Sequence, residues 1–283
     1  MEVVTAIEEL RRRIREVKAG GASIGFVPTM GFLHQGHLSL MERARRENDF
    51  LVISIFVNPL QFGRGEDLDR YPRDREGDLA KARKVGCDLV FFPEEKTLYP
   101  PGFTTYVQVE GLSSVLCGVS RPTHFRGVAT VVNKLFNLVQ PDRAYFGQKD
   151  AQQAILIKRM VADLNMNLEV VVCPTVREED GLAMSSRNNY LTPQERRAAP
   201  VLYRALKAGE ELIAGGERSP RAVVRRMEEV IAGEPLVKKV DYLVVVDAEN
   251  LQEKDPLEGS LLLAGAVYIG KARLIDNIIV NLA

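Results

Sequence analysis

The sequence has few histidines and cysteines, no excess of charge of either sign and no long apolar segment. Its 283 residues include 38 basic and 38 acidic side chains, and no basic block stands out. A broad positive surface for gripping an RNA or DNA backbone is not indicated, which argues against a nucleic-acid partner. No apolar stretch is long enough for a signal peptide or a membrane span, so we expect no membrane association.

Cysteine occurs only three times, as Cys87, Cys117 and Cys173. The three residues lie far apart and in no Cys-x-x-Cys spacing, and an odd number does not suggest a disulfide framework. Cys87 and Cys173 follow or adjoin apolar runs, where buried reduced thiols are common. We therefore expect a cytoplasmic protein without disulfides. The hydrophobic content of 46% is ample for a core in one large domain or two smaller ones.

Two of the three histidines lie in one short stretch, His34-Gln35-Gly36-His37. Residues 22–28 before it predict a short buried strand, and residues 38–45 after it predict a helix. Side chains three apart near a helix start share a face, so both imidazoles can approach a ligand held by the free N–H groups of the first turn. Such a site suits a phosphate. The alternative is that both histidines are ordinary surface or capping residues.

Polar side chains also follow the apolar run at residues 50–57, which predicts a strand buried on both faces. Asn58 and Gln61 come just after it. Because ligands of open α/β sheets bind at the carboxyl ends of strands, these two residues are candidates to line a site. The alternative is an ordinary turn around Pro59. The charged segment 63–73 is interpreted either as a lid or as a solvated connector.

Further candidate residues precede two predicted helices. Arg121 and His124 lie before the helix at residues 127–139, where a small carboxylate could bind; the alternative is a cap and loop without function. Gly147, Lys149 and Asp150 follow a predicted strand at the start of another helix. Lysine there can neutralise phosphate charge and aspartate can accept hydrogen bonds from ribose hydroxyls. The alternative is an N-capped helix with a surface lysine.

The alternation of strands and helices predicts an α/β fold, a doubly wound (Rossmann-like) parallel sheet over residues 1–180. A smaller α+β domain is expected over residues 181–283. The predicted strands are 22–28, 50–57, 88–93, 104–109, 143–146, 168–174, 242–246, 261–264 and 274–280. The predicted helices are 7–18, 38–45, 74–85, 127–139, 151–164, 194–214 and 220–232.

The motif His34-Gln35-Gly36-His37 after a strand resembles the His-x-Gly-His signature of the nucleotidylyltransferase superfamily. Segments 28–37, 56–62, 71–73, 146–153 and 184–188 together closely resemble the pantothenate synthetase family, in family order and over nearly the whole chain. The resemblance implies an enzyme that condenses pantoate with β-alanine using ATP. Members of the family form pantoyl adenylate and pyrophosphate, and the β-alanine amine then displaces AMP to give pantothenate.

The resemblance also implies roles for individual residues. His37 would be the proton donor, with His34 and Lys149 also at the phosphates. Pantoate and β-alanine would be bound by Gln61 and Gln153, with Asn58, Arg121 and His124 nearby. The implied ATP contacts are Met30, Gly31, Phe32, Leu33, His34, Gln35, Gly36, His37, Gly147, Gln148, Lys149, Asp150, Val176, Met184, Ser185, Ser186 and Arg187.

Other implications concern charge, metal and assembly. Residues 183–187 retain only Met-Ser and one cation of the superfamily's Lys-Met-Ser-Lys-Ser loop, so Lys149 is expected to supply the missing charge. Mg2+ would bind mainly through the nucleotide phosphates, without a dedicated metal site. A homodimer is expected. Two alternatives are a nucleotidyltransferase that stops after transferring AMP and a catalytically silent module that binds nucleotide or RNA.

Overall fold

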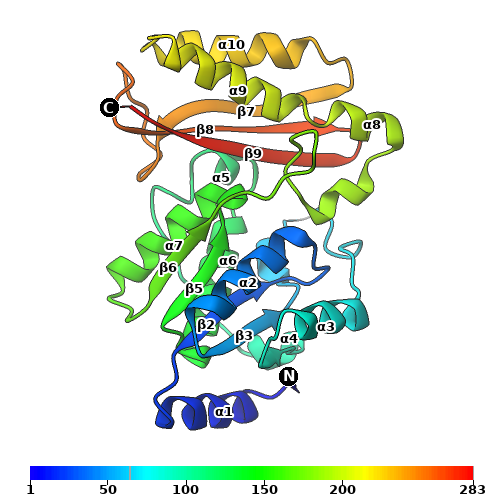
Figure 1. Ribbon diagram of the computed structural model, residues 1–283, viewed down its shortest axis with the longest axis vertical. Coiled ribbons are helices and arrows are strands. Elements are labelled where there is room, and N and C mark those ends of the chain that lie inside the picture. The colour runs from blue at the N-terminus through cyan, green and yellow to red at the C-terminus, as the bar shows by residue number, and fades with distance from the viewer. Residues whose placement is uncertain (64, 283) are drawn as a thin grey trace. The chain divides into compact units, whose positions relative to one another are not determined.

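The computed structural model describes residues 1–63 and 65–282, which form two compact units with a sheet in each (Figure 1). The first unit comprises Met1–Ser114, Arg121–Gly147 and Leu156–Pro174. The second comprises Val115–Ser120, Gln148–Ile155 and the chain from Thr175 onward. Two short segments of the second unit therefore interrupt the first along the sequence.

The first unit contains a six-stranded sheet in the order β1-β4-β3-β2-β5-β6, and its neighbouring strands are parallel. Its strands are β1 (Glu2–Val4), β2 (Ile24–Thr29), β3 (Phe50–Ile55), β4 (Leu89–Phe91), β5 (Arg143–Gly147) and β6 (Glu169–Cys173). Its helices are α1 (Ile7–Ala19), α2 (Gln35–Glu47), α3 (Arg75–Lys84), α4 (Glu95–Leu98) and α6 (His124–Val139), and α7 (Ala151–Asp163) has residues in both units.

Helices cover both faces of this sheet. Successive side chains of a strand point to opposite faces, so neighbouring residues of β2 contact different helices. Val27 of β2 belongs to a core cluster with Met41 of α2 and Ala82 of α3. The preceding residue, Phe26, instead contacts Phe136 of α6 edge-on, with ring centroids 6.4 Å apart. The predicted doubly wound parallel sheet is confirmed.

The second unit is built on an antiparallel sheet in the order β7-β8-β9. Its strands are β7 (Val237–Asp247), β8 (Ser260–Ile269) and β9 (Ala272–Asn281), and its helices are α5 (Cys117–Ser120), α8 (Pro193–Ala198), α9 (Val201–Ala214) and α10 (Pro220–Ala232). Helices α9 and α10 lie side by side on one face of the sheet (Figure 1). Leu206 of α9 and Met227 of α10 pack there with Leu263 of β8, which confirms the predicted α+β arrangement.

The strand predicted at residues 104–109 is wrong, because this segment pairs with no strand. The Val107 N–H donates instead to the Thr130 hydroxyl of α6 at 3.0 Å. The guanidinium of Arg126, also on α6, stacks over the Tyr106 ring at 4.7 Å from its centroid. The β-favouring residues of this segment therefore pack against a helix rather than within a sheet.

The single helix predicted at residues 194–214 is also wrong, since α8 ends at Ala198 and α9 begins at Val201. Pro200 separates them. Proline has no N–H to continue the helical hydrogen bonds, so the helix is interrupted there even though Ala199 keeps helical backbone angles. The short elements β1 and α4 were not predicted, because three or four residues carry too little periodicity to be recognised.

The three cysteines are buried and free, as expected for reduced thiols. Burial raises the pKa of the Cys87 thiol to about 12, so this side chain stays protonated at neutral pH. Within residues 1–63 and 65–282, no helix is long and apolar enough to cross a membrane.

Candidate active site

Polar segments follow the carboxyl ends of neighbouring strands in the first unit. Residues from Met30 follow β2, Asn58 comes shortly after β3, and Gly147 closes β5. The chain winds outward from β2 in one direction through β3 and in the other through β5, so the strand order reverses between β2 and β5. Open α/β sheets bind ligands at the carboxyl ends of the strands beside such a reversal. This end of the sheet is therefore the candidate site of the first unit.

His34 and His37 cap the start of α2 reciprocally. The Nδ1 atom of His34 accepts from the Gly36 N–H at 3.2 Å, and the Nδ1 atom of His37 accepts from the His34 N–H at 3.3 Å. The two ring centroids are 4.1 Å apart. The structure therefore brings both rings together at a helix start, where both act as caps. Capping is compatible with a phosphate site, because the N-terminus of α2 favours an anion.

The two caps also determine where each imidazole holds its proton. A ring nitrogen that accepts a hydrogen bond bears no hydrogen, so each neutral ring carries its proton on Nε2. Both rings of His34 and His37 can therefore act as hydrogen-bond donors through Nε2. Protonation of Nδ1 would break the corresponding cap.

The turn between β2 and α2 is fixed by α3. Phe32 has a positive φ of 52°, which is uncommon for a bulky residue, and it follows Gly31 with a φ of 83°. The buried carboxylate of Asp78 accepts from the Phe32 and Leu33 N–H groups at 2.8 and 2.7 Å. Lys81 donates to the Leu33 carbonyl at 2.8 Å. Asp78 therefore holds the left-handed start of the histidine turn, which is defined here as residues 31–37.

Gln61 lies buried just beyond β3 with its amide engaged on both sides. Its Nε2 atom is 3.1 Å from the Met30 sulfur, and its Oε1 atom accepts from the Asn58 amide at 3.0 Å. Asn58 is held in turn by the Gly127 carbonyl at 3.1 Å and by the Tyr99 hydroxyl at 2.8 Å. Asn58 therefore fixes the orientation of the Gln61 side chain.

Arg121 and His124 both contact the main-chain carbonyl of Gln61. Nη2 of Arg121 donates to it at 3.2 Å, and Nδ1 of His124 lies 2.9 Å from it. Arg121 also forms a two-pronged ion pair with Glu66, at 2.9 and 2.5 Å. Burial alone would raise the pKa of Glu66, but Arg121 holds it below its ordinary value. The predicted lid segment is therefore tied to Arg121 at Glu66, while its residue Arg64 lies outside the described residues.

The lysine turn, residues 148–150, belongs to the second unit. The Lys149 side chain is 19% exposed, and its Nζ is 3.8 Å from a carboxylate oxygen of the half-exposed Asp150. Gln153 lies partly buried in the first turn of α7. A cation beside an exposed acid, both at a helix start, suits a ligand that carries phosphate and hydroxyl groups.

Val176 and residues 184–187 form a second candidate segment of this unit. The Met184 N–H donates to the Val176 carbonyl at 3.0 Å, and the Ser185 hydroxyl accepts from the Arg187 N–H at 3.3 Å. Ser186 is buried in the same short 3-10 turn. The structure thus brings the predicted nucleotide residues of this segment together.

Several residues that shape these turns were missed by sequence reasoning, namely Asp78, Tyr99, Asp276 and Asn277. Asp78 lies in a helix whose apolar periodicity is weak, so nothing marked its burial. Asp276 and Asn277 did leave a signal, because they interrupt the apolar run of residues 274–280 with two polar side chains. Buried polar pairs in a strand require partners, and such an interruption predicts a structural or functional contact.

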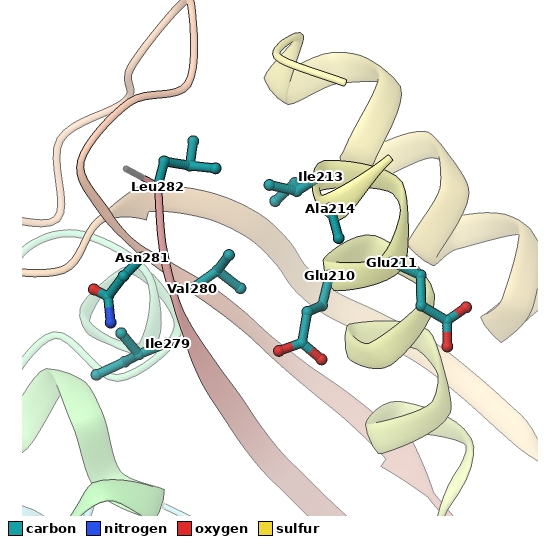
Figure 2. Close-up of a pocket in the computed structure, with 8 residues that line it drawn as sticks. All are labelled: Glu210, Glu211, Ile213, Ala214, Ile279, Val280, Asn281 and Leu282. Carbon is teal, nitrogen blue, oxygen red and sulfur yellow. The ribbon is translucent and has the colours of Figure 1, made fainter. Parts of the chain in front are cut away.

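Two other kinds of candidate site were considered in the part of the chain that the structure describes: a cluster of metal ligands and the surface cleft of Figure 2. Among the residues that the structure describes, no group of three His, Cys, Asp or Glu side chains could hold a metal ion. The cleft has a volume of about 510 Å³ and lies between the end of α9 and the end of β9 (Figure 2). Glu210 and Glu211 line it, and their charge would repel a phosphate.

The fold defines an α/β protein with a doubly wound parallel sheet, a class in which a helix start beside the strand-order reversal can hold a phosphate-bearing ligand. The family model described as pantoate-beta-alanine ligase matches residues 2–279. The chain therefore belongs to the pantoate–β-alanine ligase family and is an enzyme of that type. This confirms the family and the activity predicted from the sequence, and it favours the ligase over the nucleotidyltransferase and the silent module.

Similarity extends over the full length of known relatives. The pantothenate synthetases of Moorella thermoacetica and Pelotomaculum thermopropionicum are 55% and 56% identical over 281 residues, 99% of each chain. The crystal structure of pantothenate synthetase from Thermus thermophilus is 52% identical, with a TM-score of 0.93 over 98% of this chain and 99% of that one. The Francisella tularensis pantoate-beta-alanine ligase, whose structure is described as complexed with beta-gamma ATP and beta-alanine, is 35% identical, with a TM-score of 0.80 over 99% and 97%.

Proposed function

We propose that this enzyme joins pantoate to β-alanine in two steps that consume ATP. In the first, a pantoate carboxylate oxygen bonds to the α-phosphorus, and the bond from that phosphorus to pyrophosphate breaks. In the second, the β-alanine nitrogen, which must arrive as the unprotonated amine, bonds to the acyl carbon and loses one further proton to solvent. The acyl carbon–oxygen bond breaks, and AMP leaves with the oxygen that came from pantoate.

The observation that carries this proposal is the histidine-capped start of α2 at the strand-order reversal. Charge builds on the equatorial oxygens of the α-phosphate as the carboxylate attacks. The Nε2–H groups of His34 and His37 and the first N–H groups of α2 would donate to these oxygens. Lys149 would add a full positive charge. Donors that bind more strongly as charge develops accelerate the step rather than merely binding ATP.

His37 is proposed as the proton donor through hydrogen bonding. Its cap places the proton on Nε2, from which it can be shared with a phosphate oxygen. Complete transfer would require Nδ1 to be protonated and hence the bond from the His34 N–H to open. The capped geometry therefore favours hydrogen-bond donation over full transfer in the adenylation step.

Gln61 and Gln153 are proposed to bind pantoate, because neutral amides can recognise hydroxyls without attracting the β-alanine ammonium group. Asn58, Arg121 and His124 support this role by holding Gln61, as their contacts with its side chain and carbonyl indicate. The charge of Arg121 is already balanced by Glu66, so we propose that it orients Gln61 more than it attracts a carboxylate.

The remaining predicted residues are proposed to bind the nucleotide. Gln35, Gly36 and residues 30–33 would face the phosphates, and Gly147, Gln148 and Asp150 the ribose side. Val176, Met184, Ser185, Ser186 and Arg187 would close over ATP. The ATP and β-alanine named for the Francisella tularensis enzyme support this assignment.

Mg2+ is proposed to enter with ATP as part of the substrate, bound mainly through the phosphate oxygens, where it would assist the leaving pyrophosphate. The homodimer, the cytoplasmic location and a domain boundary at residues 180 and 181 remain predictions from the sequence.

An isotope experiment tests the two-step route. Pantoate labelled with 18O in its carboxylate is converted with ATP, Mg2+ and β-alanine, and the products are analysed by mass spectrometry. The proposal predicts one 18O atom in each AMP and one in each pantothenate amide. Label-free AMP, or ADP and phosphate as products, would contradict an adenylate.

A further inference from the structure

Asn277 lies on β9, outside the segments for which a ligand contact was predicted. The residue belongs to the second unit and is 4% exposed. A buried amide costs free energy unless its polar atoms are paired, so its partners indicate its purpose.

The Asn277 side-chain amide makes three hydrogen bonds with the lysine turn. Its Oδ1 accepts from the Gln148 amide at 2.9 Å. Its Nδ2 donates to the carbonyls of Gln148 and Lys149 at 3.0 and 2.9 Å. A primary amide offers two donors and a carbonyl, and all three are used here on two consecutive residues.

These two carbonyls belong to the peptide planes on either side of the Lys149 Cα. Each peptide unit is planar, so the orientation of both planes sets φ and ψ at Lys149. The direction in which the lysine side chain leaves the main chain is then fixed by Asn277. A cation that acts as a point charge depends on such positioning, since its own side chain is flexible.

The preceding residue on β9, Asp276, does the same for the other candidate segment of this unit. Its carboxylate accepts two hydrogen bonds from Arg177, at 2.6 and 2.9 Å. Arg177 also donates to the Gly181 carbonyl at 3.0 Å, and its main chain bridges to Ala183, directly before Met184. Two adjacent buried side chains of one strand thus hold both proposed nucleotide-binding segments of the second unit.

We infer that Asn277 is a positioning residue for Lys149 in adenylate formation. The inference rests on the proposed role of Lys149. Asn277 touches no reacting atom, so its loss should lower kcat for adenylation and leave the KM for pantoate nearly unchanged. A misplaced cation should slow the step by about 10- to 100-fold.

A double-mutant cycle tests this inference. Pantoate-dependent exchange of labelled pyrophosphate into ATP is measured for wild type, Asn277→Ala, Lys149→Ala and the double variant, at enzyme concentrations high enough to quantify the slowest. Asn281→Ala is the matched control, because Asn281 is an exposed asparagine on the same strand. Thermal unfolding is recorded for every variant.

The inference predicts that Asn277→Ala lowers kcat about 10- to 100-fold in wild type but less than about 2-fold in the Lys149→Ala background, because the two residues act through one interaction. Asn281→Ala should match wild type. An equal loss in both backgrounds would mean a general structural role and would overturn the inference. If Asn277→Ala does not fold, Asn277→Ser, which keeps one donor, replaces it under the same criteria.

The cycle also separates this inference from the proposed function. A slow Lys149→Ala enzyme combined with Asn277→Ala activity equal to that of Asn281→Ala would overturn only the role of Asn277. A Lys149→Ala enzyme with wild-type exchange would overturn the proposed role of Lys149, and the inference with it.

Discussion

The histidine turn and the lysine turn are proposed to act on the same nucleotide, yet they are held in place by different kinds of contact. The histidine turn is capped by two of its own side chains, and its backbone is fixed by Asp78, which follows Leu33 by 45 residues. The lysine turn is fixed by Asn277, which follows Lys149 by 128 residues. One turn is built largely from its own motif and the other from a distant strand.

This difference indicates how each turn responds to change elsewhere. A substitution in the β7-β8-β9 sheet should disturb the lysine turn more than the histidine turn, because Asp78 and the reciprocal caps that hold the histidine turn belong to the first unit. In the histidine turn, by contrast, the imidazoles of His34 and His37 cap a helix and are also proposed to donate to the nucleotide. A substitution of either ring should therefore affect both stability and catalysis.

The largest expected effect separates those two roles of His37. In His37→Asn the side-chain oxygen can replace Nδ1 as the acceptor for the His34 N–H, but nothing replaces Nε2–H. We expect adenylation to slow by about 10²–10⁴-fold while the unfolding temperature stays near that of wild type. In His37→Ala the cap is lost as well, which should lower the free energy of unfolding by about 1 kcal/mol. Pyrophosphate exchange and thermal unfolding measure the two effects.

The pair of His37 variants is its own control, since only the acceptor differs between them at the cap. If His37→Asn kept wild-type exchange, the ring would be a structural cap alone. Equal stability of the two variants would show that the reciprocal cap contributes nothing measurable.

A smaller effect is expected at Asp78, which supports the histidine turn from outside. Asp78→Asn offers one acceptor where the Phe32 and Leu33 N–H groups need two, so one buried donor loses its partner. Asn also removes a charge that burial disfavours, and this gain offsets the lost hydrogen bond, so the free energy of unfolding should change by about 1 kcal/mol or less. The displaced turn should slow exchange by about 10-fold. Unchanged exchange in Asp78→Asn would separate Asp78 from the site.

The pH dependence sharpens this test. Burial raises the pKa of Asp78 despite the Leu33 and Phe32 N–H groups, with Lys81 opposing and Asp74 adding to the rise. The folded protein therefore takes up this proton at higher pH than the unfolded chain does. As the pH falls from the raised pKa of the folded state towards the ordinary pKa of the unfolded chain, protonation of Asp78 increases the free energy of unfolding. The protonated carboxyl, however, is a poorer acceptor for the N–H groups of the histidine turn. As the pH is lowered, the rate of pyrophosphate exchange should therefore fall before the unfolding temperature does. Asp78→Asn has no carboxyl at this position and should not show this early fall in rate. The same acid dependence of exchange in wild type and Asp78→Asn would contradict the prediction.

The sequence predicted the fold where periodicity was strong. The parallel sheet follows from buried β-favouring runs such as residues 50–55, and α6 from its apolar stripe. Residues 104–109 show the limit of that reasoning, because Tyr106 and Val107 have strand-forming side chains that pack on a helix instead. A high β-propensity shows that a side chain suits a half-buried surface. It does not show whether a strand or a helix packs against that surface.

The candidate site was predictable where residues are close in sequence. The pairing of His34 with His37 follows from helix geometry, and the segments around Lys149 and Met184 were recognised by resemblance. The supports at Asp78, Asp276 and Asn277 were not, since their partners become neighbours only after the sheets form. Arg121 was expected to bind the carboxylate of a small ligand, which stays a prediction, and the structure pairs its guanidinium with Glu66 of the same chain.

Both turns are proposed to serve one adenylation step that precedes amide formation, and this is the central claim. Its most direct test is exchange of labelled pyrophosphate into ATP by the wild-type enzyme, with Mg2+ and pantoate but without β-alanine. The claim predicts exchange that requires pantoate, and release of AMP only after β-alanine is added. Exchange without pantoate, or none from folded enzyme that still makes pantothenate when β-alanine is present, would contradict it.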